Sequence, residues 1–283
     1  MKEALFYKKL DGKALRCLLC PHSCHIQEGR HGLCGVRLNK EGKLYSINYG
    51  RVSSIALDPI EKKPLYHFHP KSYILSVGTQ GCNFACQFCQ NWSISKNLDV
   101  LTEPVSSLEL IEKAKDAGSF GIAYTYNEPF IWYEFVYETV QLARKAGLAN
   151  VLVTNGFVNQ EPLEEILPFI DAMNIDLKSI RDDFYKKICQ GRLEPVLKTI
   201  KRAKQACHIE LTNLIIPTLN DSDDDLVDLV EWVYHELGDE VPLHFSRYFP
   251  CYKMSIPSTP KETLQKAQRI ALKKLKYVYL GNI

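Results

Sequence analysis

The sequence predicts an α/β fold, in which a parallel sheet curls into a partial, TIM-like (β/α)6 barrel behind a small cysteine-rich segment. From Tyr73 onward, short apolar runs alternate with longer stretches of helical period, which is the pattern of repeated β/α units. Residues 1–70 lack that alternation, and they hold four of the ten cysteines and five of the eight histidines. We therefore expect a metal-binding N-terminal segment at 1–70 and a barrel at 71–283.

Six segments are candidate strands, because each is a short apolar run bounded by turn-forming or helical sequence. Six strands of this kind, each followed by a helix, predict a sheet that curls without forming a complete eight-stranded barrel. The segments are "YILSVGT" (73–79), "GIAYTYN" (121–127), "NVLVTN" (150–155), "DAMNIDLK" (171–178), "HIELTNLIIP" (208–217) and "PLHFSRYF" (242–249).

The helices between these strands have recognisable ends. Ser106 and Glu109 have the spacing of a capping box, and Gly118 is expected to end that helix. The segment "DSDDDLVDLVEWVYHELG" (221–238) begins with acidic residues, which the helix dipole favours there, and ends at a glycine. The last helix is expected at about 260–276, with a lysine-rich face that we interpret as solvated surface.

Composition sets limits on location and partners. Hydrophobic residues make up 46% and charged residues 24% of the chain, and the formal net charge is +2, which does not argue for nucleic-acid binding. We expect no membrane span and no secretory signal, and therefore a cytoplasmic protein. Clustered cysteines in a reducing compartment are metal ligands or redox groups more often than disulfides. The isolated Cys189, Cys207 and Cys251 are expected to be small buried hydrophobes.

One connection is unusually long. Residues 80–105 separate the first strand from its helix, whereas such loops usually have about 2 to 6 residues. This loop carries Cys82, Cys86 and Cys89 with three and then two residues between them. In β/α barrels, the loops after the strands carry the active site. The cysteines are therefore expected at the catalytic end.

Three cysteines can be read in two ways. A tetrahedral zinc site would need a fourth ligand, which His67 or His69 could supply. Alternatively, three thiolates can hold a cubane iron–sulfur cluster and leave one iron open for a substrate or cofactor, whereas a cluster with four cysteines normally only transfers electrons.

The segment Cys82-Asn-Phe-Ala-Cys86-Gln-Phe-Cys89 resembles the signature of radical S-adenosylmethionine (SAM) enzymes. The resemblance implies a 4Fe-4S cluster whose open iron chelates the amino and carboxylate groups of SAM. It also implies that Phe88 packs near the adenine of SAM.

Later strand ends resemble the SAM-binding positions of the same enzymes. "TYNEP" (125–129) takes the place of their Gly-Gly-Glu-Pro segment. Backbone groups of Tyr126 and Asn127, with the Glu128 carboxylate, would then hold the amino group of SAM. Asn155 lies in the segment Thr-Asn-Gly (154–156). The activating enzymes of glycyl radical proteins carry an Asp immediately before this segment, whereas this chain has Val153 there. The amino group is therefore expected to depend more on Glu128 and on backbone carbonyls.

Three further residues complete the expected SAM site. Asp176 and Lys178 are two apart in "IDLKS" and hence lie on one face of a strand. A lysine on an inward position needs an anionic partner. The resemblance to the activating enzymes implies that Asp176 contacts the ribose and Lys178 the carboxylate of SAM. His244 resembles a histidine near the nucleoside, although a structural role fits it nearly as well.

The expected function is that of a radical SAM oxidoreductase, activating-enzyme-like and of the EC 1.97.1 type. Such an enzyme cleaves SAM reductively to methionine and a 5'-deoxyadenosyl radical, which abstracts hydrogen from a substrate, and the protein supplies binding and electrostatics. The activating-enzyme resemblance suggests a protein or peptide substrate. A small molecule, a lipid or a nucleic acid fits the residues equally well. The alternative from another class is a non-catalytic iron–sulfur or zinc protein.

The first cysteine cluster predicts a second metal centre. Cys17, Cys20, Cys24 and Cys34 are spaced by two, three and nine residues, closely enough to share one metal. Four thiolates without an open position favour structural zinc. A second iron–sulfur cluster is the alternative, although the spacing is not that of bacterial ferredoxins.

The whole chain resembles the radical SAM component of the AmmeMemoRadiSam system, a family related to pyruvate formate-lyase activating enzymes. This resemblance implies Memo-like and AMMECR-like partners and an electron donor of the flavodoxin or ferredoxin type. Longer members continue into a cysteine-containing tail, so we expect any function of that tail to be absent here or to have been cut off. The resemblance rests on the two cysteine segments together with "LDPIEKKPLYHFHP" (57–70), "AYTYNEP" (123–129) and "HFSRYFP" (244–250).

Overall fold

One eight-stranded sheet organises the chain in the computed structural model, which describes residues 1–283. The strand order is β16-β15-β14-β13-β12-β11-β9-β8. Every neighbouring pair from β9 to β16 is parallel, and β8 is antiparallel to β9. The strands are β8 (Ser54–Pro59), β9 (Tyr73–Gly78), β11 (Gly121–Tyr124), β12 (Ala149–Thr154), β13 (Ala172–Asp176), β14 (His208–Ile215), β15 (Leu243–Arg247) and β16 (Val278–Gly281).

The predicted α/β class is confirmed, and all six predicted strands are present, as β9 and β11 to β15. Two edge strands, β8 and β16, were not predicted. Five of the six residues of β8 are not buried, and its apolar residues Ile55, Ala56 and Leu57 follow one another without alternation, so its sequence lacks the alternating pattern of a half-buried strand. It forms because its backbone pairs with β9 from Ser54↔Gly78 to Pro59↔Tyr73. Residues 54–59 therefore belong to the barrel sheet, although they lie within the expected 1–70 segment.

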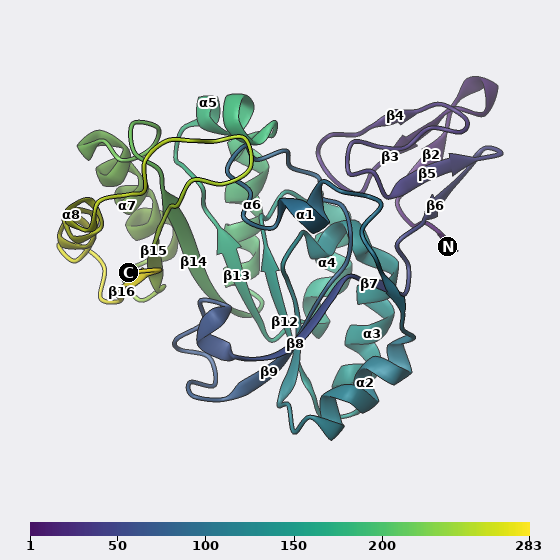
Figure 1. The fold of residues 1–283 in the computed structure, drawn as a ribbon, viewed down its shortest axis with the longest axis horizontal. Helices are drawn as coiled ribbons and strands as arrows, with labels where there is room; N and C mark the ends of the chain where they lie inside the picture. Colours follow the sequence, from purple (N-terminus) through teal and green to yellow (C-terminus); the bar gives the residue numbers. More distant parts are fainter.

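Helices surround the sheet on its outer side (Figure 1). The predicted capping box is confirmed: Ser106 Oγ accepts from the Glu109 N–H at 3.2 Å, and Glu109 Oε2 accepts from the Ser106 N–H at 2.7 Å. The last helix ends at Ala271, earlier than predicted. The longer helices are α2 (Ser107–Asp116), α3 (Tyr133–Lys145), α4 (Gln160–Ile166), α6 (Leu193–Lys204), α7 (Asp223–Leu237) and α8 (Lys261–Ala271); α1 (Trp92–Ser95) and α5 (Asp182–Phe184) are short. No helix is both long and apolar enough to cross a membrane.

The N-terminal strands form two small antiparallel sheets, ordered β1-β6-β5 and β2-β3-β4, which lie together at one side of the barrel (Figure 1). A buried ion pair attaches them: Arg37 Nη2 lies 2.8 and 3.0 Å from the two carboxylate oxygens of Glu134 in α3. The bounds are β1 (Lys2–Glu3), β2 (Tyr7–Lys9), β3 (Leu15–Cys17), β4 (His25–Ile26), β5 (Arg37–Lys40) and β6 (Lys43–Ser46), while β7 (Arg51–Val52) pairs with β10 (Glu103–Pro104).

The segment between β8 and β9 crosses from one edge of the sheet toward the other. It begins with a helical turn at Ile60–Lys62. Farther along, the His67 ring lies 2.6 Å from the hydroxyl of Tyr279 in β16, and the His67 N–H donates to Glu210 in β14 at 2.7 Å. Both contacts are near the amino ends of those strands, so this segment covers that end of the partial barrel.

Candidate active site

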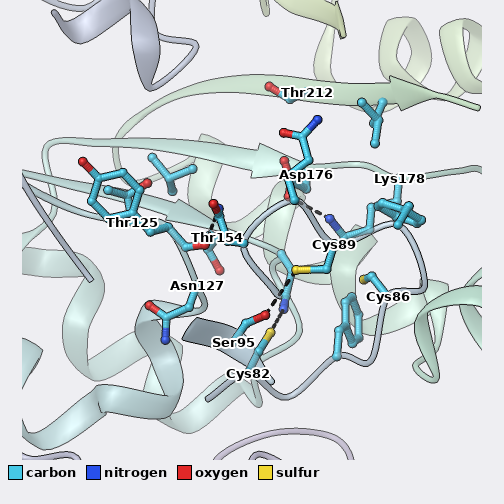
Figure 2. Close-up of a pocket in the computed structure, with 18 of the residues that line it drawn as sticks. Cys82, Cys86, Cys89, Ser95, Thr125, Asn127, Thr154, Asp176, Lys178 and Thr212 are labelled. Carbon is cyan, nitrogen blue, oxygen red and sulfur yellow. Dashed lines mark hydrogen bonds and ion pairs between the residues drawn. The ribbon is translucent and has the colours of Figure 1, made fainter. Parts of the chain in front are cut away.

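A cavity of about 310 Å³ extends from the carboxyl ends of the strands, where the cysteine loop lies, to the helical turn that follows β8. All three cysteines of the long loop line it, together with the Asp176 carboxylate and the Lys178 ammonium (Figure 2). Strand ends far apart in the sequence meet here, because parallel strands place all their carboxyl ends at one edge of the sheet.

The long loop is held against the strand ends by its backbone. Gly81 has φ +88°, and a Cβ there would lie 2.6 Å from the carbonyl oxygen of Cys34, so no other residue fits without displacing the N-terminal segment. Asn127 fixes the same turn, since its amide donates to the Gly81 carbonyl at 2.8 Å and accepts from the Thr79 N–H at 3.2 Å. The N–H of Lys253, after β15, donates to the Gln87 carbonyl at 3.0 Å. The cysteine loop is thus tied to three other parts of the chain.

The three thiols fit a cubane cluster better than a single ion. Hydrogen-bonding groups face two of them: the Asn155 amide donates to Cys82 Sγ at 3.8 Å, and Ser95 Oγ lies 3.2 Å from Cys89 Sγ. Such contacts stabilise cluster-bound thiolates. The zinc alternative lacks its expected fourth ligand, because neither His67 nor His69 lines the cavity.

The thiols differ in acidity. Burial raises the pKa of Cys82 to about 12 and also raises the pKa of Cys89. The neighbouring thiol of Cys189 and the charge of Lys178 lower the pKa of Cys86 to about 7, against the effect of burial. Cys189 is fully buried, as expected from the sequence, but its position beside Cys86 was not predicted. Because thiolates are the metal ligands, cluster binding here would release protons.

Asp176 and Lys178 meet as the sequence predicts. Lys178 Nζ lies 2.8 Å from Asp176 Oδ2 and 5.7 Å from the centre of the Phe88 ring. Burial opposes the charged form of Lys178, but Asp176 and the nearby thiols hold its pKa well above its usual range. All three residues line the cavity. The cavity therefore presents an ammonium, a carboxylate and an aromatic face close to Cys86.

Tyr126, Asn127 and Asn155 also line the cavity. Tyr126 has φ +71°, an unusual conformation for a residue with a bulky side chain. Its carbonyl accepts from the Asn91 amide at 2.6 Å, and its hydroxyl donates to Asp58 Oδ2 in β8 at 2.8 Å. Tyr126 thus links the cysteine loop to the first edge strand.

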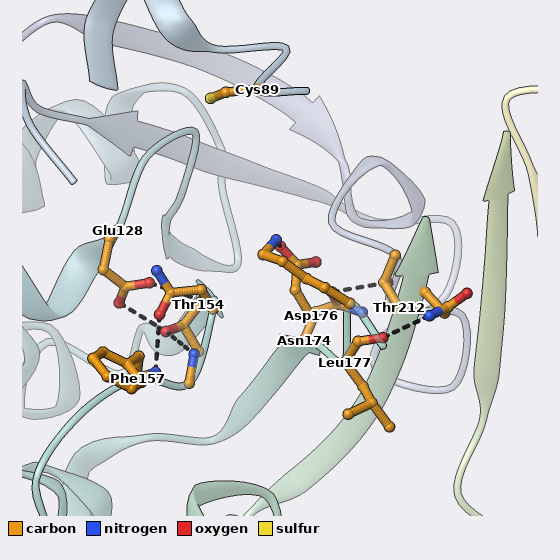
Figure 3. Close-up of polar contacts among 12 residues, drawn as sticks. Cys89, Glu128, Thr154, Phe157, Asn174, Asp176, Leu177 and Thr212 are labelled. Carbon is orange, nitrogen blue, oxygen red and sulfur yellow. Dashed lines mark hydrogen bonds and ion pairs between the residues drawn. The ribbon is translucent and has the colours of Figure 1, made fainter. Parts of the chain in front are cut away.

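Glu128 does not line the cavity. Its carboxylate is fully buried and accepts three hydrogen bonds, from the Phe130 N–H at 3.0 Å, the Thr154 hydroxyl at 2.7 Å and the Asn155 N–H at 2.8 Å. Figure 3 shows Glu128 beside Thr154. Burial raises its pKa to about 7, although these three donors oppose the shift. In this position Glu128 orients Asn155 and Thr154, and its oxygens face the protein.

His244 lies outside the cavity as well. Its ring nitrogen is 2.6 Å from Glu210 Oε2, and its ring stacks on Tyr279 with centroids 5.2 Å apart. His244 and Glu210 are both near the amino ends of their strands, away from the cysteine loop. The sequence could not distinguish this position from a nucleoside contact, because both place a histidine on an inward strand face.

Several residues of the cavity were not predicted. Thr212 in β14 and Ser246 in β15 have a weak signal, because each follows a polar strand residue by two positions, Glu210 and His244 respectively, and so lies on the same face of the strand. Lys62 and Lys63 have no sequence signal for a place in the cavity, because a lysine pair before an expected domain boundary is typical of solvent-exposed surface. The unpredicted lining residues are Lys62, Lys63, Phe84, Gln90, Asn91, Ser95, Thr125, Val153, Thr154, Thr212, Leu214 and Ser246.

The first cysteine cluster is separate from this cavity. Cys17, Cys20, Cys24 and Cys34 are free thiols in the N-terminal sheets and the turns between them. Burial, with a contribution from the nearby Cys17 thiol, raises the pKa of Cys34 to about 11. Burial also raises the pKa of Cys20, and the thiols of Cys17, Cys24 and Cys34 add to that shift, so the four are neighbours, but they are not gathered into the geometry of a metal-ion site.

Comparison with known proteins decides the family. Residues 76–233 match the model of the radical SAM superfamily. The chain belongs to the radical SAM superfamily. Membership implies a 4Fe-4S cluster and SAM, and so a radical SAM enzyme. The cavity built from Cys82, Cys86 and Cys89 is the place in this chain with the superfamily's three-cysteine pattern.

The chain is also similar to individual proteins. An uncharacterized protein of Methanocaldococcus jannaschii is 49% identical over 288 residues, covering 100% of this chain and 86% of that protein. The pyruvate formate-lyase-activating enzyme of Clostridium pasteurianum is 26% identical over 179 residues, covering 56% and 74%. The structure of Streptococcus suis SuiB bound to S-adenosylmethionine has a TM-score of 0.58 at 14% identity, covering 74% and 52%. The predicted superfamily and the homology to activating enzymes are thus confirmed.

Proposed function

We propose that this chain binds a 4Fe-4S cluster and SAM in the cavity and abstracts hydrogen from a substrate. When bound, the cluster supplies the electron that cleaves SAM to methionine and a 5'-deoxyadenosyl radical. The observation that carries the proposal is that Cys82, Cys86 and Cys89 share one cavity with Asp176 and Lys178. A carrier that only transfers electrons would have no need of an ion pair beside its cluster.

The chain's own residues would act by binding and orientation. Cys82, Cys86 and Cys89 would hold the cluster, and Asn155 and Ser95 would stabilise two of their thiolates by the contacts described above. Water would be excluded by the loop itself, since Cys86 is 8% exposed. A water-poor environment strengthens each of these electrostatic interactions.

The SAM contacts follow from the same cavity. We assign Lys178 to the carboxylate of SAM, Asp176 to its ribose and Phe88 to its adenine. Backbone groups of Tyr126 and Asn127 would hold the amino group. Asn155, also on the lining, is a further candidate contact.

Two predicted contacts take a supporting role in this proposal. Glu128 would hold Asn155 and Thr154 in place through its three hydrogen bonds. His244 would fix the opposite end of the barrel with Glu210. Neither needs to touch SAM to matter for its binding.

The homology to activating enzymes supports a protein or peptide substrate, with chemistry of the EC 1.97.1 type. A small-molecule substrate is the second candidate, and it is favoured by Lys62 and Lys63, which line the cavity in addition to Lys178. In either case the reducing electron would come from a flavodoxin or ferredoxin type donor. Placement in the AmmeMemoRadiSam system, with Memo-like and AMMECR-like partners in the cytoplasm, is part of the proposal.

The proposal is tested by anaerobic reconstitution with iron and sulfide, followed by dithionite and SAM. Chromatography should detect 5'-deoxyadenosine from the wild type and none from Cys86→Ala. Cys207→Ala is the matched control, because that thiol lies outside the cavity and contacts the Ala203 carbonyl. A wild-type protein with a full cluster that releases no 5'-deoxyadenosine would contradict the proposal.

We also propose a second metal centre on Cys17, Cys20, Cys24 and Cys34, with zinc preferred over a second iron–sulfur cluster. The mutual proximity of the four thiols supports it. Elemental analysis of a variant with alanine at all three cysteines of the long loop isolates this centre. Zinc alone is expected there, and iron would rule out the zinc preference.

A further inference from the structure

One wall of the cavity comes from outside the region that matches the superfamily model. Lys62 and Lys63 precede residues 76–233 in the chain, yet both line the cavity that the three cysteines share. They stand at the end of the helical turn that follows β8. The Lys62 side chain is 68% exposed, so this wall borders solvent.

This wall carries an excess of positive charge. The Asp58 carboxylate lies 2.8 Å from Lys63 Nζ and 3.2 Å from Lys62 Nζ, and it accepts from the Tyr126 hydroxyl at 2.8 Å. Burial favours the neutral acid, but these three partners hold the pKa of Asp58 well below its usual range. One carboxylate therefore faces two ammonium groups, so these three side chains together carry one net positive charge.

The hydrogen bonds of Lys63 are incomplete. Its side chain is 3% exposed, and an ammonium has three N–H donors. Its Nζ atom makes one hydrogen bond, to Asp58, and the Tyr126 ring covers one side at 4.6 Å. A buried charged donor without an acceptor is costly. The remaining donors thus call for an acceptor in the cavity, and an anion satisfies both the donors and the excess charge.

We propose that Lys62 and Lys63 bind an anionic group, a carboxylate or a phosphate, on a small-molecule substrate. The inference rests on the proposed function, because it places that substrate in the cavity where the radical would form. It refines the substrate class: the backbone of a glycine peptide carries no charge to match these lysines. The hydroxyls of Thr212 and Ser246, also on the lining, suit a polar molecule.

The test measures anion binding, separately from catalysis. The cluster-reconstituted full chain with SAM, and without a reductant, is dialysed to equilibrium against radiolabelled inorganic phosphate or radiolabelled succinate. Lys62→Met removes the exposed charge. The double variant Asp58→Asn/Lys63→Met removes the buried donor and its partner together, so that no unpaired charge is left in the core. Lys71→Met, at an exposed lysine of the same segment that does not line the cavity, is the control.

The wild type is expected to bind phosphate, succinate or both saturably. The anion that binds more tightly shows whether the site prefers a phosphate or a carboxylate. Both test variants should bind it about tenfold more weakly, which corresponds to about 1.4 kcal/mol, while Lys71→Met should match the wild type. Binding of neither anion, or equal binding by all variants, would overturn the inference. SAM affinity, measured in the same dialysis, separates the two failures: intact SAM binding without anion binding leaves the proposed function standing.

Discussion

Lys178 Nζ lies 2.8 Å from Asp176 Oδ2, just past the end of the strand that carries Asp176. The two residues are adjacent on the wall of the cavity that the three cysteines share. Because the Lys178 side chain is only 12% exposed, its charge is weakly screened and acts strongly on any ligand placed there.

Lys178→Met should weaken SAM binding about tenfold or more, because a charge-assisted hydrogen bond contributes about 1.5–3 kcal/mol. Equilibrium dialysis of labelled SAM against the reconstituted protein measures the effect. Lys187→Met is the control, since Lys187 is 73% exposed and pairs with Asp183 on the surface. Unchanged affinity in Lys178→Met would remove this residue from the SAM site.

Glu128→Ala should lower the free energy of unfolding by at least about 2 kcal/mol, because two backbone N–H groups and the Thr154 hydroxyl lose their buried acceptor. SAM affinity should fall as well, because Asn155 loses its anchor. Urea unfolding and dialysis measure the two effects. Ala substitution of the exposed Glu112 provides the comparison. A loss of SAM affinity with full stability would instead indicate direct contact between Glu128 and SAM.

Arg37→Ala should destabilise the protein by about 3–5 kcal/mol, because it leaves the Glu134 carboxylate buried without its cation. The N-terminal sheets should then become sensitive to limited proteolysis before the barrel does. Arg37→Met with Glu134→Gln removes both charges and keeps an acceptor for the Leu5 N–H, which bonds Glu134 at 2.8 Å. This double variant should recover most of the loss, and failure to do so would show that the ion pair itself is needed.

Glu210 should make the fold sensitive to acid. Burial disfavours its charge, but hydrogen bonds from His208, His244 and the His67 N–H lower its pKa to about 2. A carboxyl whose folded pKa lies below its unfolded value stabilises the fold above about pH 4.5. That contribution, about 3 kcal/mol, is lost as the pH falls toward 2.

Thermal unfolding of the metal-free chain between pH 6 and pH 3 checks this prediction. The Tm of the wild type should fall more steeply below pH 4.5 than the Tm of Glu210→Gln. Gln substitution of the exposed Glu112 should leave the wild-type slope unchanged. Parallel curves for the wild type and Glu210→Gln would show that Glu210 does not titrate in this window.

How far the sequence predicts the site depends on the kind of signal. The cysteine spacing and the pair Asp176 and Lys178 are local patterns, and a strand's two-residue period places such a pair on one face. The same reasoning could not tell that Glu128 turns into the protein. Its direction is set by the N–H groups of Asn155 and Phe130, and Asn155 belongs to a different strand end.

By itself, the sequence determined the β/α alternation, the long loop with Cys82, Cys86 and Cys89, and membership of the radical SAM superfamily, because each is encoded by local spacing. Only the tertiary structure decided that β8 joins the barrel sheet and that Lys62 and Lys63 reach the cavity. Neither feature has a periodic signal in the sequence. β8 forms through backbone pairing with β9. The lysines face the cavity because Asp58 of β8 and the ring of Tyr126 hold them there. Long-range pairing of this kind leaves little trace in local composition.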